Sequence, residues 1–280
     1  MNKIKTNKIK IMINGLPGNV AASIAGNALS DDRFELLPFS LTGPEINDTV
    51  FHMDSMNIKL IRPDERDHSI RSIIKEHTPF ISVDYTHPTA VNDNTDFYCR
   101  NGLPFVMGTT GGDRKLLCDT VEKSTIPAVI APNMTKQIVG FQAMMEYAAN
   151  TFPGLFEGYS LEIRESHQNG KADTSGTAKA MVEIFNRLGI PFSKEDIIKE
   201  RNPDRQKTEW KIPEEYLSGH AWHTYSLVSE DQTVKFEFKH NVNGREIYSK
   251  GTFDAISYLE KKRKQGAVGK VFTMIDVLKG

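Results

Sequence analysis

The sequence predicts an α/β protein that contains a parallel sheet flanked by helices and a second, α+β domain with a mixed sheet. Short apolar segments alternate with helical segments over the first half of the chain, which is typical of parallel sheets with right-handed crossovers. A glycine turn joins the first strand to the first helix. The second half holds a long helix and several strand segments joined by polar turns. A length of 280 residues suits one large domain or two ordinary ones.

The composition excludes several functional classes. Hydrophobic residues make up 39% of the chain and charged residues 25%, as in ordinary soluble globular proteins. The net charge of −1 gives no basic field for nucleic acid, and no apolar run approaches the roughly 20 residues of a transmembrane helix. Neither Cys99 and Cys118 nor the 8 histidines show the spacing of metal ligands. We therefore expect a cytoplasmic protein without metal, nucleic-acid or membrane partners, unless a transit peptide has been removed.

The glycine turn is the first candidate binding motif. The strand 9–14 runs into GLPGNVA at 15–21, and a helix of small residues follows. The glycines allow a tight turn and a close approach of the backbone to a pyrophosphate, which the helix N-terminus would attract. By itself the pattern fits a plain tight turn equally well, but its strand-turn-helix context favours a Rossmann-type dinucleotide-binding domain. The candidate phosphate-binding residues are Gly15, Gly18, Asn19 and Val20.

The end of the second strand bears on the choice of cofactor. The strand 34–39 ends in Ser40-Leu-Thr42-Gly43 and has no acidic residue at this end, where one would bind a ribose 2′-hydroxyl and favour NAD. Ser40 and Thr42 can donate hydrogen bonds to a 2′-phosphate. We therefore expect NADPH as the cofactor, with NADH still possible because no arginine stands nearby.

The following segments repeat the order of strand and helix. The expected strands are 58–61, 80–84, 104–107 and 126–131, and the expected helices are 69–76, 90–101 and 114–123. Polar turns follow three strands of this domain, at 14–15, 84–88 and 108–110. Ligands of open parallel sheets bind at the carboxyl ends of the strands, so these turns together favour a dinucleotide site.

The second half begins with a helix at 136–152. Its first residue is Lys136, and a cation is disfavoured at a helix N-terminus, so this side chain either has an anionic neighbour or is solvated. The charged segment 194–215 is interpreted as a solvated excursion or a subunit rim rather than a substrate-binding region.

Strands dominate the remaining part of the chain. They are expected at 160–165, 221–229, 233–241 and 246–253, and the final helices at 254–264 and 271–278. We expect Phe236 and Phe238 on a buried face and His223 on an edge of the sheet. The final helices are expected to return to the first domain.

The segment 160–189 holds the strongest candidate site. A strand leads into a polar loop and then into a helix, with good N-cap residues at 173–175. Ser175–Thr177 offers backbone N–H groups and hydroxyls to a carboxylate, and Lys171 adds a positive charge. His167, with a pKa free to lie near neutrality, can act as a general acid. The alternative is an ordinary capped helix with a surface histidine.

The loop ESHQNGKADTSGTA at 165–178 resembles the signature loop of the dihydrodipicolinate reductase family. VDYTHPTAVNDN, PFVMGTTGGDR, SGHAWH, FEFKHNVNGR and MIDVL are similar to the plant-like branch of that family, whose plant members have plastid targeting. The resemblance covers nearly the whole chain. It implies NADPH-dependent reduction of 4-hydroxy-tetrahydrodipicolinate to tetrahydrodipicolinate, on the route to diaminopimelate and lysine.

The resemblance also implies roles for single residues. His167 matches the catalytic acid of the family, and Lys171 matches the lysine that donates a proton and binds substrate. Most bacterial members have a second histidine, which contacts substrate, at the position of Gln168. A glutamine at this position matches the plant-like branch. The carboxylate cradle corresponds to Ser175, Gly176 and Thr177. The cofactor positions correspond to Gly15, Gly18, Thr86, Gly108, Thr110, Asn133 and Met134.

These expectations combine into one domain plan. Residues 1–133 and 254–280 would form the dinucleotide-binding domain, and residues 134–253 a domain for substrate binding and oligomerisation. The connections would lie near Pro132 and Lys250, and the protein would be a homodimer or homotetramer acting on a small dicarboxylate. A different class is a redox-sensing regulator that binds NADPH without turnover, which has no use for a histidine and a lysine together in the loop.

Overall fold

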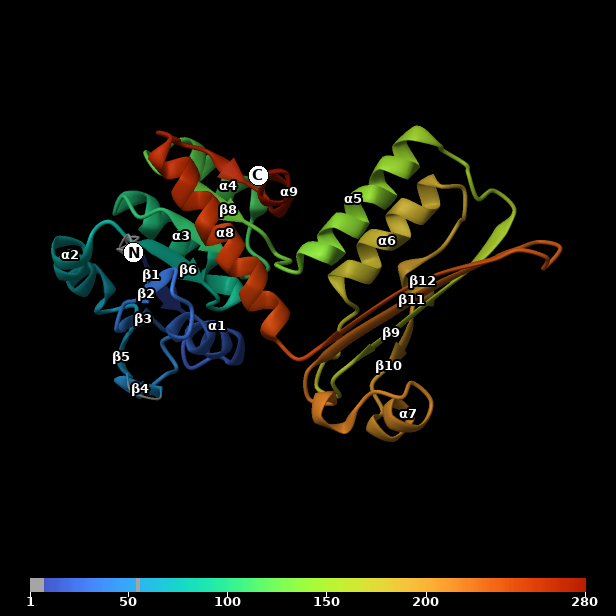
Figure 1. The fold of residues 1–280 in the computed structure, drawn as a ribbon, viewed down its shortest axis with the longest axis horizontal. Coiled ribbons are helices and arrows are strands. Elements are labelled where there is room, and N and C mark those ends of the chain that lie inside the picture. The colour runs from blue at the N-terminus through green and yellow to red at the C-terminus, as the bar shows by residue number, and fades with distance from the viewer. Residues whose placement is uncertain (1–7, 54–55) are drawn as a thin grey trace, which may run out of the picture. The chain divides into compact units, whose positions relative to one another are not determined.

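The structure is a computed structural model that describes residues 8–53 and 56–280 (Figure 1). The chain divides into two compact units, one ending at Lys136 and resuming at Glu246–Gly280, the other spanning Gln137–Arg245. The boundaries between the two units therefore differ from those at 133 and 254 that the sequence led us to expect. The later one differs because the residues before 254 belong to a helix of the first unit.

That helix is the largest departure from the expected elements. Residues 246–253 are not a strand but the first half of α8, Glu246–Lys264. Ser249, Thr252, Phe253 and Ile256 are buried, and this spacing of three or four residues is that of a helix. Gly251 lets α8 approach the preceding chain, since a Cβ there would lie 1.7 Å from the Met134 carbonyl oxygen. Lys250, expected near a connection, therefore lies inside a continuous helix.

The first unit is built on a six-stranded sheet in the order β13-β8-β7-β6-β1-β2, in which every pair is parallel. Its strands are β1 Ile9–Asn14, β2 Phe34–Leu36, β6 Ile81–Asp84, β7 Phe105–Met107, β8 Ala128–Ile130 and β13 Val271–Phe272. The expected helix at 271–278 is wrong in its first residues, because Val271 and Phe272 pair with β8 and α9 begins at Met274. The predicted parallel sheet is confirmed.

Helices cover both faces of this sheet. They are α1 Asn19–Leu29, α2 Arg66–His77, α3 Val91–Arg100, α4 Arg114–Glu122, α8, and α9 Met274–Lys279. Apolar residues of α2, α3 and α4 share one core with the strands. The helix α8 packs beside α1 and against β7 and β8 (Figure 1). Asp254 of α8 also forms an ion pair with Lys136 at the start of α5, Lys136–Thr151, so of the two alternatives for this lysine the anionic neighbour is confirmed.

The expected second strand is split in two. After β2, the chain continues as β3 Phe39–Leu41, which belongs to a small sheet in the order β3-β5-β4, with β4 Val50–Met53 and β5 Met56–Ile61. Pro38 stands at the break, where it has no N–H group for a ladder hydrogen bond. The Gly15 N–H donates to the Leu41 carbonyl oxygen at 2.8 Å, so the end of β3 still lies beside the glycine turn.

The second unit contains a four-stranded sheet in the order β10-β9-β11-β12. This confirms the predicted mixed sheet, although β10 was not expected and the strand expected at 246–253 is absent from it. Its strands are β9 Tyr159–His167, β10 Ile198–Glu200, β11 His220–Ser229 and β12 Lys235–Asn243. Only β10 is parallel to its neighbour β9 among these described pairs. Apolar residues of α5 and α6, Gly176–Arg187, pack on one face of the sheet (Figure 1). The short helix α7, Pro203–Thr208, follows β10.

Two expectations about this sheet are wrong. Phe236 is 41% exposed, because it lies on the edge strand β12. His223 is 2% exposed, because β11 has a partner on either side. Among the helices of residues 8–53 and 56–280, none is long and apolar enough to cross a bilayer.

Candidate active site

The strand β9 presents Glu165 and His167 on the same face, since side chains of a strand alternate. The neighbouring strand places His223 directly opposite Glu165 in the antiparallel register. The imidazole rings of His167 and His223 lie edge to face with centroids 5.2 Å apart. Three polar side chains, all buried, therefore meet at one end of the sheet.

Glu165 organises this end of the sheet. Its side chain is fully buried, and one carboxylate oxygen accepts a hydrogen bond from Arg201 Nη2 at 2.5 Å. The other oxygen accepts from the Ser175 backbone N–H at 3.0 Å and lies 3.8 Å from His223 Nε2. A buried carboxylate is costly unless it is paired and hydrogen-bonded, so these contacts fix the start of α6 relative to β9.

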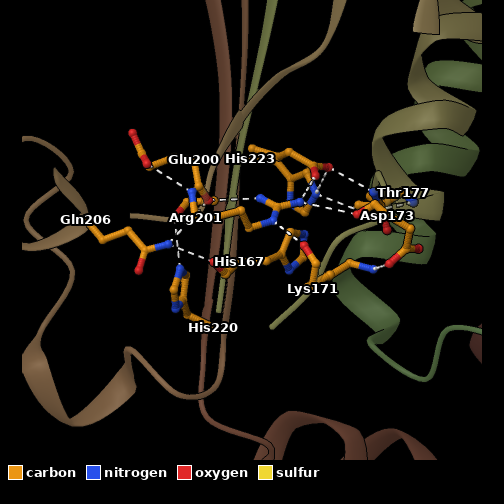
Figure 2. A network of polar contacts seen from close by, with 12 residues as sticks. His167, Lys171, Asp173, Thr177, Glu200, Arg201, Gln206, His220 and His223 are labelled. Atoms are coloured by element: carbon orange, nitrogen blue, oxygen red, sulfur yellow. Dashed lines mark hydrogen bonds and ion pairs between the residues drawn. The ribbon is translucent and has the colours of Figure 1, made fainter. Parts of the chain in front are cut away.

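Arg201 is a site residue that the sequence interpretation missed. It follows β10 within the charged segment 194–215, which was expected to be a solvated excursion, yet its side chain is 17% exposed. Its Nε donates to the Lys171 carbonyl oxygen at 2.7 Å, and Nη2 also donates to the Asp173 carbonyl oxygen at 3.3 Å. Figure 2 shows the guanidinium between Gln206 and His220 on one side and Lys171 and Asp173 on the other. Arg201 thereby holds the loop backbone in place.

His167 does not have the near-neutral pKa expected from the sequence. It is 7% exposed, and within the described part of the chain its Nε2 is buried without a hydrogen-bond partner. Burial, followed by the positive charges of Arg201 and Lys171, lowers the pKa of His167 to about 3. The imidazole is therefore neutral at physiological pH in the free protein. The Gln206 amide donates to the His167 carbonyl oxygen at 2.7 Å and fixes its backbone.

The loop after His167 carries the second cation. Lys171 Nζ donates to Asp173 Oδ1 at 2.7 Å, with 23% of the lysine side chain exposed. The Lys171 N–H donates to the Gln168 carbonyl oxygen at 3.0 Å and closes a turn, and the Gln168 side chain is half-buried. The expected loop residues are thus brought together with Arg201, and each of the two cations is paired with a carboxylate, Lys171 with Asp173 and Arg201 with Glu165.

The residues of the expected carboxylate cradle lie at the start of α6, and one of them is engaged within the protein. Ser175 is the N-cap, and its Oγ accepts from the Thr177 N–H at 3.2 Å while lying 3.1 Å from His223 Nε2. The Ser175 hydroxyl is therefore engaged within the protein. Gly176 is exposed, Thr177 is half-buried, and no acidic residue stands in the first turn. Within that turn the helix end offers an anion backbone N–H groups and no carboxylate, and the nearby Asp173 is paired with Lys171.

Glu165, His167 and His223 also place possible metal-ligand atoms within 4.8 Å of one another. The sequence spacing gave no sign of this cluster, because β9 and β11 bring its members together. The carboxylate already accepts hydrogen bonds from Arg201 and from the Ser175 N–H. A divalent cation here would lie next to a guanidinium, so the arrangement suits an anion better than a metal.

The glycine turn of the first unit fits a dinucleotide. Gly15 has φ of 108°, and a Cβ on it would lie 2.2 Å from the Tyr85 carbonyl oxygen. A Cβ on Gly108 would lie 2.4 Å from the Tyr85 ring. Gly18 caps α1 without a side-chain hydrogen bond, and the first turn, which begins with Asn19 and Val20, has no acidic residue. Backbone N–H groups at this helix start are thus available to a phosphate.

Asp84 connects the other two strand-end turns. Its side chain is fully buried and accepts hydrogen bonds from the hydroxyls of Tyr98 at 2.7 Å, Thr86 at 2.8 Å and Thr109 at 2.6 Å. Burial, reinforced by Asp84, raises the pKa of Tyr98 well above its ordinary value, so that hydroxyl stays a donor. Thr86 is therefore held by Asp84, whereas Thr110 is exposed beyond this network.

The remaining expected cofactor residues differ in how free they are. The Thr42 hydroxyl donates to the Leu16 carbonyl oxygen at 2.7 Å, and Ser40 Oγ accepts from the Leu16 N–H at 3.3 Å. Both side chains are buried and hold the glycine turn, so in this structure they do not present donors to a 2′-phosphate. Asn133 accepts from the Thr135 N–H at 2.9 Å, and Met134 is buried.

Comparison with known proteins identifies the family. The family model for the N-terminus of dihydrodipicolinate reductase matches residues 9–134, and that for its C-terminus matches residues 138–278. A protein of Oryza sativa subsp. japonica named probable 4-hydroxy-tetrahydrodipicolinate reductase 1, chloroplastic, is 47% identical over 96% of this chain and 78% of its own length. The chain belongs to the dihydrodipicolinate reductase family.

Other relatives extend the match. The 4-hydroxy-tetrahydrodipicolinate reductase 1, chloroplastic, of Arabidopsis thaliana is 45% identical over 98% of this chain and 78% of its own length. A solved dihydrodipicolinate reductase from Paenisporosarcina sp. TG-14, bound to dipicolinate, superimposes with a TM-score of 0.65 over 95% of this chain and 97% of that one, at 19% identity. The expected family, the α/β fold with a Rossmann-type domain and the NAD(P)H-dependent reductase activity are thereby confirmed.

The buried histidines of this reductase family member predict a loss of stability in acid. Burial lowers the pKa values of His167 to about 3 and of His240 to about 4, and that of His223 falls well below the ordinary 6.5. As the pH falls below 6.5, these histidines therefore bind more protons in the unfolded chain than in the folded chain. The contribution of these histidines to the free energy of unfolding is therefore greatest above that pH and should decrease toward pH 4. Each histidine lowers the free energy of unfolding by up to about 1.4 kcal/mol per pH unit.

Urea unfolding at pH 7.0 and 5.5 measures this effect. Within this interval few ordinary carboxyl groups titrate, so the histidines dominate the change. A His240→Gln variant should show a smaller decrease than the wild-type chain. Equal unfolding free energies at the two pH values would contradict the prediction.

Proposed function

We propose that this protein reduces 4-hydroxy-tetrahydrodipicolinate to tetrahydrodipicolinate with NADPH, on the route to diaminopimelate and lysine. The observation that carries the proposal is the convergence of His167, Lys171 and Arg201 on the N-terminus of α6. Two cations and a helix start without acidic residues suit a small ring that carries two carboxylates. The dipicolinate held by the Paenisporosarcina relative is a ligand of that chemical class.

The site residues divide into those that bind and those that transfer a proton. Lys171 and the helix start at Gly176 and Thr177 bind the carboxylates of the substrate, and Gln168 contacts it by hydrogen bonds alone. The Ser175 side chain does not bind substrate directly, because its hydroxyl is engaged with His223 and with the Thr177 N–H. Arg201 positions the loop through the carbonyl oxygens of Lys171 and Asp173.

Proton transfer depends on a change in the charge around His167. In the free protein its pKa is about 3, partly because Arg201 and Lys171 are cations. A bound dicarboxylate adds negative charge beside these cations and so raises the pKa of the imidazole. His167 is then able to hold a proton and to deliver it to the ring carbon next to the reduced one. The acid thus forms when substrate binds.

The first unit provides the cofactor site. Gly15, Gly18 and the start of α1 suit a pyrophosphate, and Thr86, Gly108 and Thr110 lie at two further strand ends. Loss of water removes the ring hydroxyl together with a hydrogen of the adjacent carbon. NADPH, when bound, would supply a hydride to the carbon that carried the hydroxyl, and the proton from His167 would restore the hydrogen of its neighbour. We place Asn133 and Met134 at the cofactor as well, on the family resemblance.

A coupled assay tests the proposal. Purified protein, NADPH and freshly generated product of dihydrodipicolinate synthase are mixed, and loss of the reduced nicotinamide absorbance is followed. We expect turnover, with a higher kcat/KM for NADPH than for NADH. A parallel reaction with a known reductase controls for the unstable substrate. Binding of NADPH without oxidation in that setting would favour the redox-sensing regulator and overturn the proposed reaction.

Two further properties belong to the same proposal. We expect a homodimer or homotetramer, which light scattering of the purified chain measures directly. A cytoplasmic location, or a plastid location with a transit peptide, stays a prediction. The named plant relatives are chloroplastic.

A further inference from the structure

Arg62 lies at the strand ends where a dinucleotide places its adenosine ribose. It is the first residue after β5, and in the parallel pair of β3 and β5 the residues Leu41 and Ile61 are partners. The Thr42 N–H donates to the Ile61 carbonyl oxygen at 2.9 Å, and the Leu41 carbonyl oxygen accepts from the Gly15 N–H at 2.8 Å. The glycine turn, the end of β3 and the start of the Arg62 segment are therefore neighbours along one edge. Ligands of such sheets bind at this edge.

The two described segments beside Arg62 at this edge offer no basic side chain to a 2′-phosphate. The glycine turn at 14–20 and the segment 40–49 after β3 contain neither lysine nor arginine. The hydroxyls of Ser40 and Thr42 are buried and bonded to Leu16. A phosphate monoester requires charged donors, and Arg62, supplied by the neighbouring strand, is the cation in position to provide them.

The contacts of Arg62 leave its guanidinium available. Within residues 8–53 and 56–280, its Nε is buried and has no hydrogen-bond partner. The same Nε lies 3.7 Å from Asp64 Oδ1, an ion pair too long for a hydrogen bond. The side chains of Arg62 and Asp64 are 39% and 76% exposed. The nearby Arg66 differs, since it donates to Asn94 and stacks on the Phe97 ring. A buried N–H group without an acceptor favours a ligand that brings one.

We propose that Arg62 selects NADPH over NADH by binding the 2′-phosphate of the cofactor. A guanidinium offers paired N–H donors that match two phosphate oxygens. Glu45 stands in the segment after β3, and its carboxylate lies against Gly43, where a Cβ would fall 2.3 Å from Glu45 Oε1. We expect this carboxylate to favour NADH over NADPH. That carboxylate can accept from ribose hydroxyls and repels a phosphate. The inference rests on the proposed reductase function and adds the residue that sets its cofactor preference.

Cofactor kinetics of an Arg62→Ala variant test the proposal. The kcat/KM for NADPH should fall by about 10- to 100-fold, while that for NADH should change by less than about 3-fold, since only the 2′-phosphate contact is lost. Arg62→Lys should restore part of the loss, and Glu45→Gln should raise the NADPH preference. Arg71→Ala is the matched control, because Arg71 is an exposed arginine on α2.

A binding measurement separates this inference from the proposed reaction. Calorimetry with adenosine 2′,5′-bisphosphate and with 5′-AMP needs no turnover. The wild-type chain should bind the bisphosphate more tightly, and Arg62→Ala should remove the difference. An unchanged NADPH to NADH ratio in Arg62→Ala, or an unchanged bisphosphate affinity, would overturn the role of Arg62. Absence of turnover in the wild-type chain, with the affinity difference intact, would overturn the reaction alone.

Discussion

Replacing Arg201 by methionine should lower the free energy of unfolding of the second unit by about 3–5 kcal/mol, because it leaves the carboxylate of Glu165 buried and unpaired. Glu165 is fully buried, and Arg201 Nη2 lies 2.5 Å from its oxygen. The same change frees the carbonyl oxygens of Lys171 and Asp173, so the KM for the dicarboxylate should rise as well. Urea unfolding and steady-state kinetics measure the two effects.

A double substitution distinguishes the charge from the packing of Arg201. Glu165→Gln combined with Arg201→Met removes both charges, so it should recover much of the stability lost in Arg201→Met alone. The KM should not recover, since the loop still lacks the guanidinium. Arg187→Met is the matched control, because Arg187 is exposed, pairs with the equally exposed Glu146 and should affect stability little. A double variant as unstable as Arg201→Met would show that the buried charge is not the cause.

Replacing His167 by asparagine should lower kcat by about 10²- to 10⁴-fold, the usual contribution of a general acid. Asparagine is close to histidine in size and keeps a hydrogen-bonding group, so the buried position should remain filled. Lys171→Met should raise KM and lower kcat together, since Lys171 is proposed to bind a substrate carboxylate and by resemblance matches a lysine that also donates a proton. The exposed Lys179 on α6 gives a control, Lys179→Met, that removes a cation outside the site. Turnover of His167→Asn or Lys171→Met within a few-fold of the wild type would refute the site.

A nuclear magnetic resonance titration of His167 tests the origin of the acid. In the free protein the imidazole should stay neutral down to pH values near 4, in keeping with a pKa of about 3. Binding of pyridine-2,6-dicarboxylate should raise that pKa, because the added carboxylates offset the charges of Arg201 and Lys171. An unchanged pKa in the complex would assign the proton donor to another group, with Lys171 the first candidate.

Local pattern was sufficient for most elements of the first unit. The alternation of Ile9, Ile11 and Ile13 and the glycine turn after Asn14 predicted β1 and α1, and similar signals predicted β6, β7 and β8. These elements are specified by neighbouring residues, because period and punctuation are local properties. The strand predicted at 246–253 was wrong because it, too, relied on local pattern alone. The β-branched and aromatic residues of this segment favour a strand, but packing on the first unit selects a helix.

The loop residues His167 to Thr177 and their family were readable from the sequence, since a motif is contiguous along the chain. Arg201, Glu165 and His223 became one site through the pairing of β9 with β10 and β11, which joins residues far apart in sequence. Arg62 likewise reached the end of β3 through a strand pair. The low pKa of His167 has the same origin, because burial and nearby charge exist only once the chain has folded. The sequence thus determined which groups are present and the family to which they belong, whereas tertiary pairing determined which of them share a charge environment.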